Sequence, residues 1–303
     1  MDGIDKLVLV TRHTPLEENV ARFGTKEQAR FLLERSRAGS YAPLQSYEER
    51  FERSRDTILR AVPPDVKVQQ VDREFLPNYV FGPHDLVATL GPDGLVVNVA
   101  KYLSGQPVVA FNPDPERIDG VLVPFVAGQA STLFKQRQFR MRRLAMARVS
   151  LADGQEMHAV NDLFIGQRTH VSARYRLAFA GSAEDQSSSG IVVSTGAGST
   201  GWYRSLVTGA AGVVGSETPE DYRWDAESEE LRFTVREPFV SRASSAGLVH
   251  GSLVGGQSLE IVSAMPQGGT IFSDGVEEDF LPFDSGATAT VSVAERRVHL
   301  VAG

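Results

Sequence analysis

A change of hydrophobic pattern near residue 129 constrains the fold of this 303-residue chain more than any other feature. Before it, segments of helical periodicity alternate with short runs that predict strands, an alternating one at 66–71 and more apolar ones at 6–10, 85–90 and 107–112. Strands that alternate with helices predict a mostly parallel sheet flanked by helices. After it, short runs of alternating polarity are separated by Gly, Pro and Asp, which is typical of a β-sandwich or partial barrel. We therefore expect an α/β N-terminal domain over 1–128 and a β-rich, sandwich-like C-terminal domain over 129–303.

Two capping boxes predict helix starts in the first domain. Thr25 with Gln28 fits one box, and Ser46 with Glu49 fits a second. Within the second domain, the runs 143–150 and 157–165 flank a turn at Asp153–Gly154 and predict a hairpin.

Composition excludes several classes of function. The net charge of −7 argues against a nucleic-acid groove as the main function, and the lack of cysteine excludes disulfides and thiolate chemistry. No apolar run approaches the ~20 residues of a membrane span. The acidic first residues lack the apolar core of a signal peptide, so we expect a cytoplasmic protein without a membrane partner. The six histidines show no metal-ligand spacing, so we predict no metal-binding residues.

The segment 187–203 has the composition of a ligand-binding loop. The apolar run Ile191–Val193 predicts a buried strand, and a block of Gly, Ser and Thr follows it up to Trp202. Hydroxyl groups and exposed backbone N–H groups in such a loop suit the phosphates and ribose of a nucleotide. The loop also matches the dinucleotide fingerprint Gly196-x-Gly198-x-x-Gly201, which would have to open a βαβ unit.

A second candidate loop, Gly91-Pro92-Asp93-Gly94-Leu95, follows the apolar run 85–90. Ligands of open α/β sheets bind beyond the carboxyl ends of the strands, which is where Asp93 would lie. The motif taken alone is also a common turn, and that is its simpler interpretation.

In their order along the chain, these motifs resemble those of the NAD kinase family, within the larger group that includes diacylglycerol kinases. The family's Gly-Gly-Asp-Gly-Thr is similar to 91–95, and its Asn-Glu pair to Asn161–Asp162. Its Asp-Gly, strand and Ser-Thr-Pro-Thr-Gly-Ser-Thr-Ala-Tyr are similar to 189–202, and a later Asp-Gly to Asp274–Gly275. The order and rough spacing agree over 85–301, so the chain is identified as a divergent member of the family.

The resemblance implies a reaction and its substrates. NAD kinases transfer the γ-phosphoryl group of ATP, or of polyphosphate in some members, to the 2′-hydroxyl of the adenosine ribose of NAD, giving NADP. Phosphoryl transfer of this kind normally uses Mg²⁺. The family forms dimers and tetramers, so the resemblance also implies a homo-oligomer whose small-molecule partners are nucleotides.

The resemblance also assigns roles to residues. Asp93 matches the proposed catalytic base, with Gly91 and Gly94 in the phosphate- and ATP-binding loop. Asn161 and Asp162 match the pair that contacts the adenine and ribose region of NAD. Further NAD-binding positions are matched by Ser189, Thr200, Gly201 and Trp202. Trp202 stands where the family has a tyrosine that stacks on a ring, although plain core packing is an alternative.

Departures from the family motifs leave other functions open. Pro92 and Leu95 replace a glycine and a threonine, and Ser189 replaces an aspartate that recognises the carboxamide region of NAD. One alternative is a kinase for another hydroxyl acceptor, a sugar or a lipid. The others are a catalytically silent nucleotide-binding regulator and an oxidoreductase with a true dinucleotide fingerprint.

Overall fold

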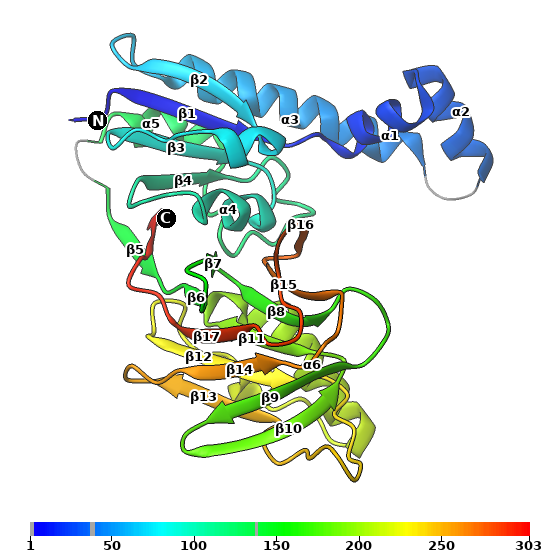
Figure 1. Cartoon of the computed structure of the whole chain (residues 1–303). Coiled ribbons are helices and arrows are strands. Elements are labelled where there is room, and N and C mark those ends of the chain that lie inside the picture. Colours follow the sequence, from blue (N-terminus) through cyan, green and yellow to red (C-terminus); the bar gives the residue numbers. More distant parts are fainter. Residues whose placement is uncertain (1–2, 37–39, 137–138) are drawn as a thin grey trace. The chain divides into compact units, whose positions relative to one another are not determined.

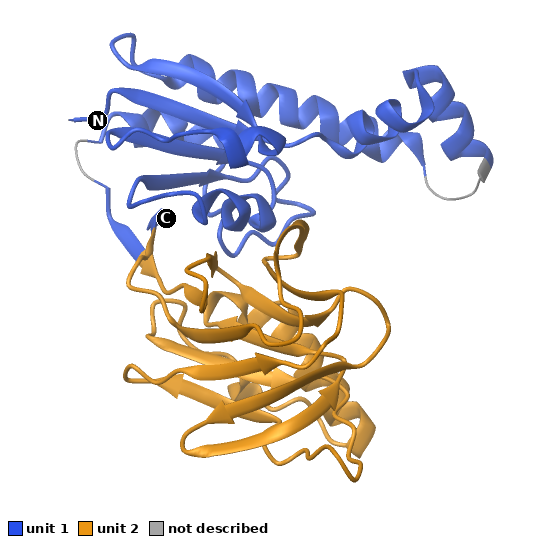
Figure 2. Cartoon of the chain, viewed as in Figure 1, with its two compact units in different colours: residues 1–142, 299–303 blue, residues 143–298 orange. Residues whose placement is uncertain are grey.

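The computed structural model describes residues 3–36, 40–136 and 139–303 (Figure 1). The chain forms two compact units, unit 1 with residues 1–142 and 299–303, and unit 2 with residues 143–298 (Figure 2). These units differ from the predicted domains, 1–128 and 129–303, because residues 129–142 and 299–303 pack with unit 1.

Unit 1 contains a six-stranded sheet with the strand order β2-β1-β3-β4-β18-β5. Its strands are β1 (Lys6–Thr11), β2 (Lys67–Asp72), β3 (Asp85–Leu90), β4 (Pro107–Phe111), β5 (Met141–Leu144) and β18 (Val298–Val301). The neighbours from β2 to β18 run parallel, which confirms the predicted parallel sheet. The final strand β18 joins this sheet beside β4, so its predicted place in the second domain is wrong.

Helices cover the sheet of unit 1 and extend beyond it (Figure 1). They are α1 (Pro15–Phe23), α2 (Lys26–Ser36), α3 (Tyr41–Ala61), α4 (Asp93–Ala100) and α5 (Ala130–Phe134), with 3-10 turns at Arg73–Asn78 and Ala127–Gln129. Leu7, Leu9 and Leu86 of the sheet pack against α3 and α5, which contribute Phe51 and Phe134 to one apolar core. Burial of these side chains holds the helices on the sheet.

The two predicted helix starts have different outcomes. Thr25 Oγ1 accepts a hydrogen bond from Gln28 N at 3.2 Å, so the start of α2 is confirmed. The start at Ser46 is wrong, because α3 begins at Tyr41 and Ser46 lies inside it. Pro43 does not prevent the earlier start, since proline is tolerated in the first turn of a helix.

Unit 2 is a sandwich of two antiparallel six-stranded sheets, as the sequence predicts. One has the order β10-β9-β14-β17-β6-β7, with β6 (Ala147–Leu151), β7 (Glu156–Ala159), β9 (Ala173–Phe179), β10 (Ser182–Ser188), β14 (Leu259–Ser263) and β17 (Thr288–Val293). The other, called the second sheet below, has the order β13-β12-β11-β8-β15-β16. Its strands are β8 (Asp162–Gln167), β11 (Ile191–Thr195), β12 (Glu230–Val235), β13 (His250–Val254), β15 (Gly269–Ser273) and β16 (Val276–Pro282).

The two faces of the second sheet have different partners. Leu163, Ile165 and Val193 point into the core shared with the first sheet, as the alternation of a strand requires. Phe164 and Val192 lie on the other face and pack against the helix α6 (Trp202–Val214). Short 3-10 turns at Ala197–Thr200 and Glu220–Tyr222 complete the unit. The outer face of this sheet therefore carries a small apolar cluster of its own.

The hairpin predicted over 143–165 is correct only in its first part. Strands β6 and β7 pair around the turn at Asp153–Gly154. The chain then leaves the first sheet at Val160–Asn161, and Asp162 begins β8 in the second sheet. Asn161 and Asp162 consequently lie where the chain crosses from one sheet to the other, and not within one hairpin arm.

Candidate active site

The crossing segment 160–162 is held by one carboxylate, that of Asp274. Oδ2 of Asp274 accepts a hydrogen bond from Val160 N at 3.0 Å, and Oδ1 accepts bonds from Asn161 N at 2.7 Å and Asp162 N at 3.3 Å. In return, Asp274 N donates to Asp162 O at 2.9 Å. Asp274 has φ +55°, a left-handed conformation uncommon for a residue with a side chain. Such local strain is often retained at functional sites.

The loop that follows β11 supports the same segment from the other side. Thr195 N donates to Asn161 O at 2.9 Å, and Thr195 Oγ1 donates to Val160 O. Gly198 N donates in turn to Thr195 Oγ1 at 3.2 Å. The predicted site residues Asn161 and Asp162 are thereby brought together with the small-residue loop of residues 194–201.

Close packing explains two of the three glycines in the dinucleotide-like pattern. A Cβ on Gly198 would lie 2.2 Å from Asn161 O, and a Cβ on Gly196 would lie 2.1 Å from Asp225 O. Neither position accepts a side chain unless the backbone moves. These two glycines therefore serve the approach of neighbouring backbone, whereas a Cβ on Gly201 would meet its nearest atom only at 3.5 Å.

Helix α6, which the sequence does not predict, begins at Trp202 and has Gly201 as its N-cap. Thr200 ends the 3-10 turn that precedes it. A strand, a glycine-containing loop and a helix thus follow in the order of a βαβ unit. The next strand, β12, nevertheless pairs antiparallel with β11, whereas a dinucleotide-binding βαβ unit requires a parallel strand. The oxidoreductase alternative loses its structural basis.

Asp162 is the buried ionisable group of this site. Its exposure is 7%, and within the described residues no donor contacts its carboxylate. Burial, together with the nearby charge of Asp274, raises the pKa of Asp162 to about 7. Asp162 can therefore take up and release a proton near neutral pH.

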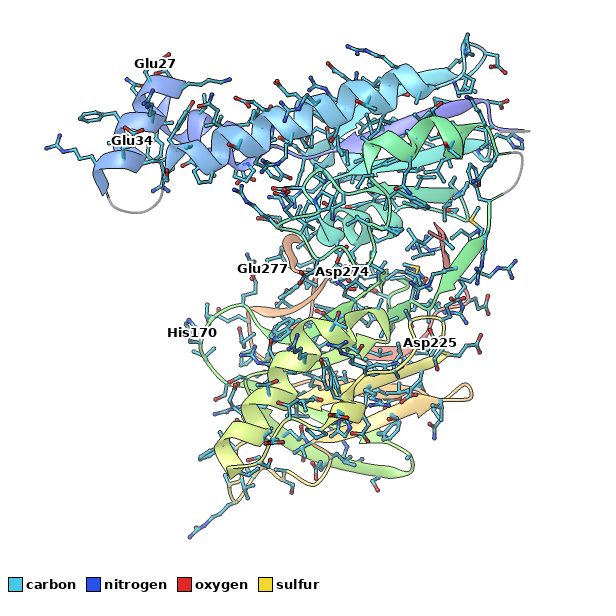
Figure 3. All side chains as sticks on the ribbon, turned by 180° about the vertical axis from the view of Figure 1, so that it is seen from behind. Glu27, Glu34, His170, Asp225, Asp274 and Glu277 are labelled. Atoms are coloured by element: carbon cyan, nitrogen blue, oxygen red, sulfur yellow. The ribbon has the colours of Figure 1, made fainter. Side chains whose placement is uncertain are left out.

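A cavity of about 430 Å³ opens on the outer face of the second sheet, and Ser189 and Trp202 are among its lining residues. Phe164 and Phe272 form an apolar wall, and Arg168 and Arg236 contribute positive charge. Figure 3 shows two further lining residues, His170 on the loop after β8 and Glu277 on the hairpin of β15 and β16. The cavity combines aromatic surface with convergent polar groups, as small-molecule sites do.

Trp202 is engaged by protein side chains as well as facing the cavity. Its ring stacks on Phe164, with centroids 5.7 Å apart and an interplanar angle of 14°. The guanidinium of Arg236 lies 5.5 Å from the ring centroid. These contacts support a packing role for Trp202, and the same ring also lines the cavity.

Two residues of the site, Asp274 and Arg236, are not predicted from the sequence. The signal for Asp274 is Ser273-Asp274-Gly275, which resembles a family motif. Arg236 follows β12 and reaches the turn Ser189–Gly190 through backbone bonds, which no local pattern reveals.

In unit 1, Asp93 is the first residue of α4, and Pro92 is its N-cap. Asp93 Oδ2 accepts from Val121 N at 3.0 Å, and Oδ1 accepts from Leu122 N at 2.9 Å. The Asp93 carboxylate thus anchors the loop that contains residues 121 and 122. Leu95, where the family has threonine, is buried.

The two glycines predicted to bind phosphate differ in their surroundings. Gly94 is exposed, and a Cβ there would meet nothing within 4 Å, whereas a Cβ on Gly91 would contact the side chain of Leu95 at 2.9 Å. The N-terminus of a helix such as α4 suits an anion such as phosphate.

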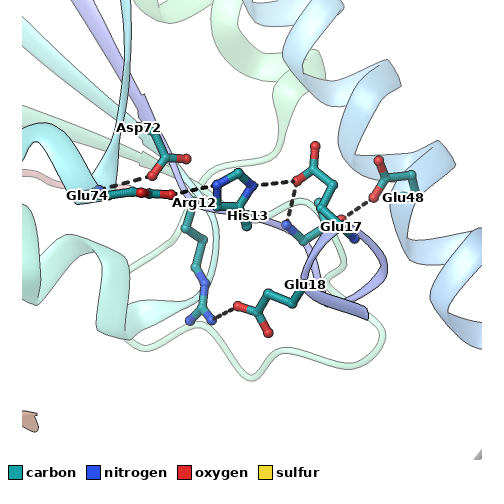
Figure 4. A network of polar contacts seen from close by, with 8 residues as sticks. Arg12, His13, Glu17, Glu18, Glu48, Asp72 and Glu74 are labelled. Atoms are coloured by element: carbon teal, nitrogen blue, oxygen red, sulfur yellow. Dashed lines mark hydrogen bonds and ion pairs between the residues drawn. The ribbon is translucent and has the colours of Figure 1, made fainter. Parts of the chain in front are cut away.

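One group of side chains in unit 1 has the arrangement of a metal site, namely His13, Asp72 and Glu74. Figure 4 shows that these residues belong to a wider network of polar contacts. His13 Nε2 lies 2.6 Å from Glu74 Oε1, so the imidazole already has a partner. The group does not fit Mg²⁺, which prefers oxygen ligands and is usually held by one or two carboxylates together with substrate phosphates.

None of the helices in the described residues has both the length and the apolar character needed to cross a bilayer.

Among known proteins, similarity to this chain is found in solved structures. No protein-family model matches the sequence, and no curated protein matches it. Yeast NADH kinase, solved in complex with NADH, is similar with a TM-score of 0.61 and 16% identity, over 98% of this chain and 83% of that one. An NAD kinase from Archaeoglobus fulgidus in complex with ATP is similar with a TM-score of 0.58 and 16% identity, over 98% and 93%. The chain has the NAD kinase fold.

Proposed function

We propose that this protein is an ATP-dependent phosphotransferase that phosphorylates the 2′-hydroxyl of the adenosine ribose of NAD or NADH. The observation that carries the proposal is the meeting of motif residues in unit 2. Asn161 and Asp162 are held against the loop of residues 194–201, on the unit whose cavity is lined by Ser189 and Trp202. The two structural neighbours, one solved with NADH and one with ATP, support the same class of reaction.

The site residues divide into two groups in this proposal. Gly91, Asp93 and Gly94 at the start of α4 would serve the phosphates of ATP, since exposed N–H groups at a helix start attract anions. Asn161, Asp162, Ser189, Thr200, Gly201 and Trp202 would serve the dinucleotide. Mg²⁺ would enter with the ATP phosphates and neutralise their charge. A homo-oligomer stays a prediction from the resemblance, and a cytoplasmic location stays a prediction from the sequence.

The cavity gives a preference between the two oxidation states of the dinucleotide. Oxidised nicotinamide carries a positive charge, and the cavity contains Arg168 and Arg236, with Glu277 as the acidic residue. Ser189 also lacks the negative charge of the family's aspartate. Like charges repel, so NADH should be the better acceptor.

An acceptor panel tests the proposal. The full-length protein is incubated with ATP and Mg²⁺ and with NAD, NADH, simple sugars or diacylglycerol, and phosphorylated products are separated and quantified. NADP or NADPH as the main product supports the proposal, and turnover of only a sugar or a lipid overturns the acceptor but keeps the kinase.

A matched pair of variants tests the role of the cavity. Arg236→Gln should change the ratio of kcat/KM for NADH and NAD. Arg176→Gln, at an exposed ion pair with Asp185 on the other sheet, should leave the ratio unchanged.

Binding of NAD and ATP in calorimetry, without any product on long incubation, would favour the silent regulator.

A further inference from the structure

An exposed aromatic side chain lies on the outer face of helix α2. The exposed fraction of Phe31 is 57%, and that of its neighbour Leu32 is 40%. The inner face of the helix is marked by Ala29, which is buried, and by Leu33, which is half-buried. At about 100° per residue, Phe31 points about 160° away from both of them. Phe31 is therefore directed away from the rest of unit 1.

The position of α2 leaves this outer face accessible. Figure 1 shows α2 beyond the sheet of unit 1, beside α1 and the first turns of α3. The helix packs against α1 and α3. From Lys26 to Arg35, every residue other than Ala29 and Leu33 is exposed. Another molecule can therefore reach the whole outer face of α2.

The charges of α2 comprise one internal ion pair and two groups that lie on either side of Phe31. Arg30 Nε lies 2.9 Å from Glu34 Oε1, one turn away. Glu27, seen with Glu34 in Figure 3, and Arg35 have no ion pair within the described residues. The guanidinium of Arg35 lies 5.6 Å from the ring centroid of Phe31. Because residues four positions apart are neighbours on a helix, Glu27, Phe31 and Arg35 form one row on its surface.

This row is complementary to itself. In an antiparallel pair of α2 helices with a two-fold axis at Phe31, a residue four positions before Phe31 faces the residue four positions after it. Glu27 of one copy then faces Arg35 of the other, and the symmetry repeats this pair. Axes of packed helices are about 8–10 Å apart, which glutamate and arginine side chains can span together. A parallel pair would instead bring like charges together.

We propose that α2 is a self-association surface, at which two copies of this chain pair through antiparallel α2 helices. The two Phe31 rings meet at the axis, with Leu32 beside them and an ion pair at each end. Single exposed apolar residues are ordinary in proteins, so Phe31 alone selects no partner. The symmetric placement of opposite charges around it selects a second copy, and the acidic group makes an anionic membrane a poorer fit. This inference does not depend on the phosphotransferase function.

The size of the contact sets its expected strength. The 11 residues of α2 span about 16 Å. A contact of this length is smaller than the standard interface of about 1,600 Å², and small interfaces belong to weak complexes. We therefore expect a dissociation constant in the micromolar range. The association should weaken as salt increases, because its ion pairs are exposed.

Charge reversal tests the pairing in the full-length protein, with sedimentation velocity over a series of concentrations. Glu27→Arg or Arg35→Glu places like charges opposite each other at both ion pairs, so each should weaken the association by about tenfold. The double variant restores both pairs and should associate within about threefold of the wild type. Glu52→Arg, at an exposed position of α3, makes the same charge change as Glu27→Arg and should leave the association unchanged.

The double variant also excludes an effect of helix stability. The native helix has an acidic residue in its first turn and a basic one in its last turn, as the helix dipole favours. Each reversal opposes the dipole at one end, and the double variant opposes it at both ends. Recovery in the double variant therefore cannot come from a more stable helix.

Phe31→Ala tests the apolar centre of the contact. It should weaken the association by about tenfold or more, because a central aromatic side chain is lost. Its circular dichroism should match that of the wild type, since alanine is the best helix former.

Each outcome decides the inference. Wild-type protein that stays monomeric at every concentration overturns it, and so does an association that Phe31→Ala and the single charge reversals leave unchanged. A double variant that associates no better than the single variants overturns the antiparallel arrangement. Binding of the monomer to vesicles of phosphatidylserine and phosphatidylcholine, lost in Phe31→Ala, would assign this face to a membrane and overturn the pairing.

Discussion

The network around His13 in unit 1 and the pair of Asp162 and Asp274 in unit 2 are both clusters of ionisable groups, but they are built in opposite ways. His13 has acidic neighbours of opposite charge, with Nε2 2.6 Å from Glu74 and Nδ1 3.6 Å from Glu17, and about half of each side chain is exposed. Asp162 and Asp274 carry like charges, and Asp162 is almost completely buried.

The two clusters differ in what their charges contribute to stability and to function. Exposed ion pairs are screened by water and salt and contribute little to folding. A buried like-charge pair is costly and persists only where the surrounding structure compensates for it. The three backbone hydrogen bonds to Asp274 provide that compensation. A carboxyl group whose pKa is raised by burial and by a specific neighbour is a candidate functional group, which the exposed network is not.

Loss of Asp274 should have the largest effect on stability. Asp274→Ala leaves three backbone N–H groups at 160–162 without their acceptor, and hydrogen bonds to charged groups contribute about 1.5–3 kcal/mol each. We expect the free energy of unfolding to fall by about 5 kcal/mol, measured by chemical denaturation. Glu278→Ala, at an exposed position on β16, is the control and should change it by less than about 0.5 kcal/mol. A loss below about 1 kcal/mol for Asp274→Ala would remove the basis of the comparison.

Asp162→Asn should stabilise the protein, with an effect that depends on pH. The folded pKa of Asp162 is raised from 3.8 to about 7, so its contribution to stability is present below pH 3.8 and is lost as pH rises through about 7. The variant should therefore be more stable than the wild type by up to about 3 kcal/mol at pH 8, and nearly equal to it at pH 4. Thermal unfolding at both pH values measures this difference. Equal unfolding temperatures at pH 8 would mean that Asp162 ionises without cost.

Trp202→Ala tests whether the cavity wall binds substrate or only packs. Removal of the indole exposes Phe164 and empties one side of the cavity. We expect KM for the dinucleotide to rise about tenfold, a binding loss of about 1.4 kcal/mol, with little change in KM for ATP. Trp202→Phe keeps an aromatic face and serves as the control. Unchanged KM together with reduced stability would assign Trp202 to packing alone.

His13→Ala should have the smallest effect. The hydrogen bond with Glu74 raises the pKa of His13, so its stabilising contribution is present below pH 6.5 and is lost as pH rises through the folded pKa. Exposure limits the loss to about 0.5 kcal/mol at pH 5.5, with no difference at pH 9. Chemical denaturation at low and high salt measures this loss of unfolding free energy, which should become smaller as the salt concentration increases. A loss above 1 kcal/mol would contradict the contrast with the buried pair.

Local pattern predicted most of the fold. The runs at 6–10, 66–71, 85–90 and 107–112 correspond to β1 to β4. Strands β1, β3 and β4 are buried between polar segments, whereas β2 at the edge of the sheet is mostly exposed. The alternating runs after residue 143 predicted the sandwich. Helix α6 was missed because Gly209 and Gly212 and its small side chains resemble the loop before it, and packing on Phe164 and Val192 holds it in place. The sheet that the last strand, β18, joins also depends on tertiary contacts, namely its pairing with β4.

The candidate site was predicted as separate motifs, and their relations came from the structure. The sequence by itself determined the residue types: carboxyl groups at 93, 162 and 274, and a small-residue loop before Trp202. These follow from residue chemistry and order, which are local properties. Tertiary structure decided that the Asp93 carboxylate accepts hydrogen bonds from the backbone N–H groups of Val121 and Leu122. These residues lie 28 and 29 positions after Asp93 in the sequence. It also brought Asp274 to Asn161 across 113 residues. The proton affinity of Asp162 depends on its burial and on Asp274, which is distant in sequence, so only the folded chain reveals it.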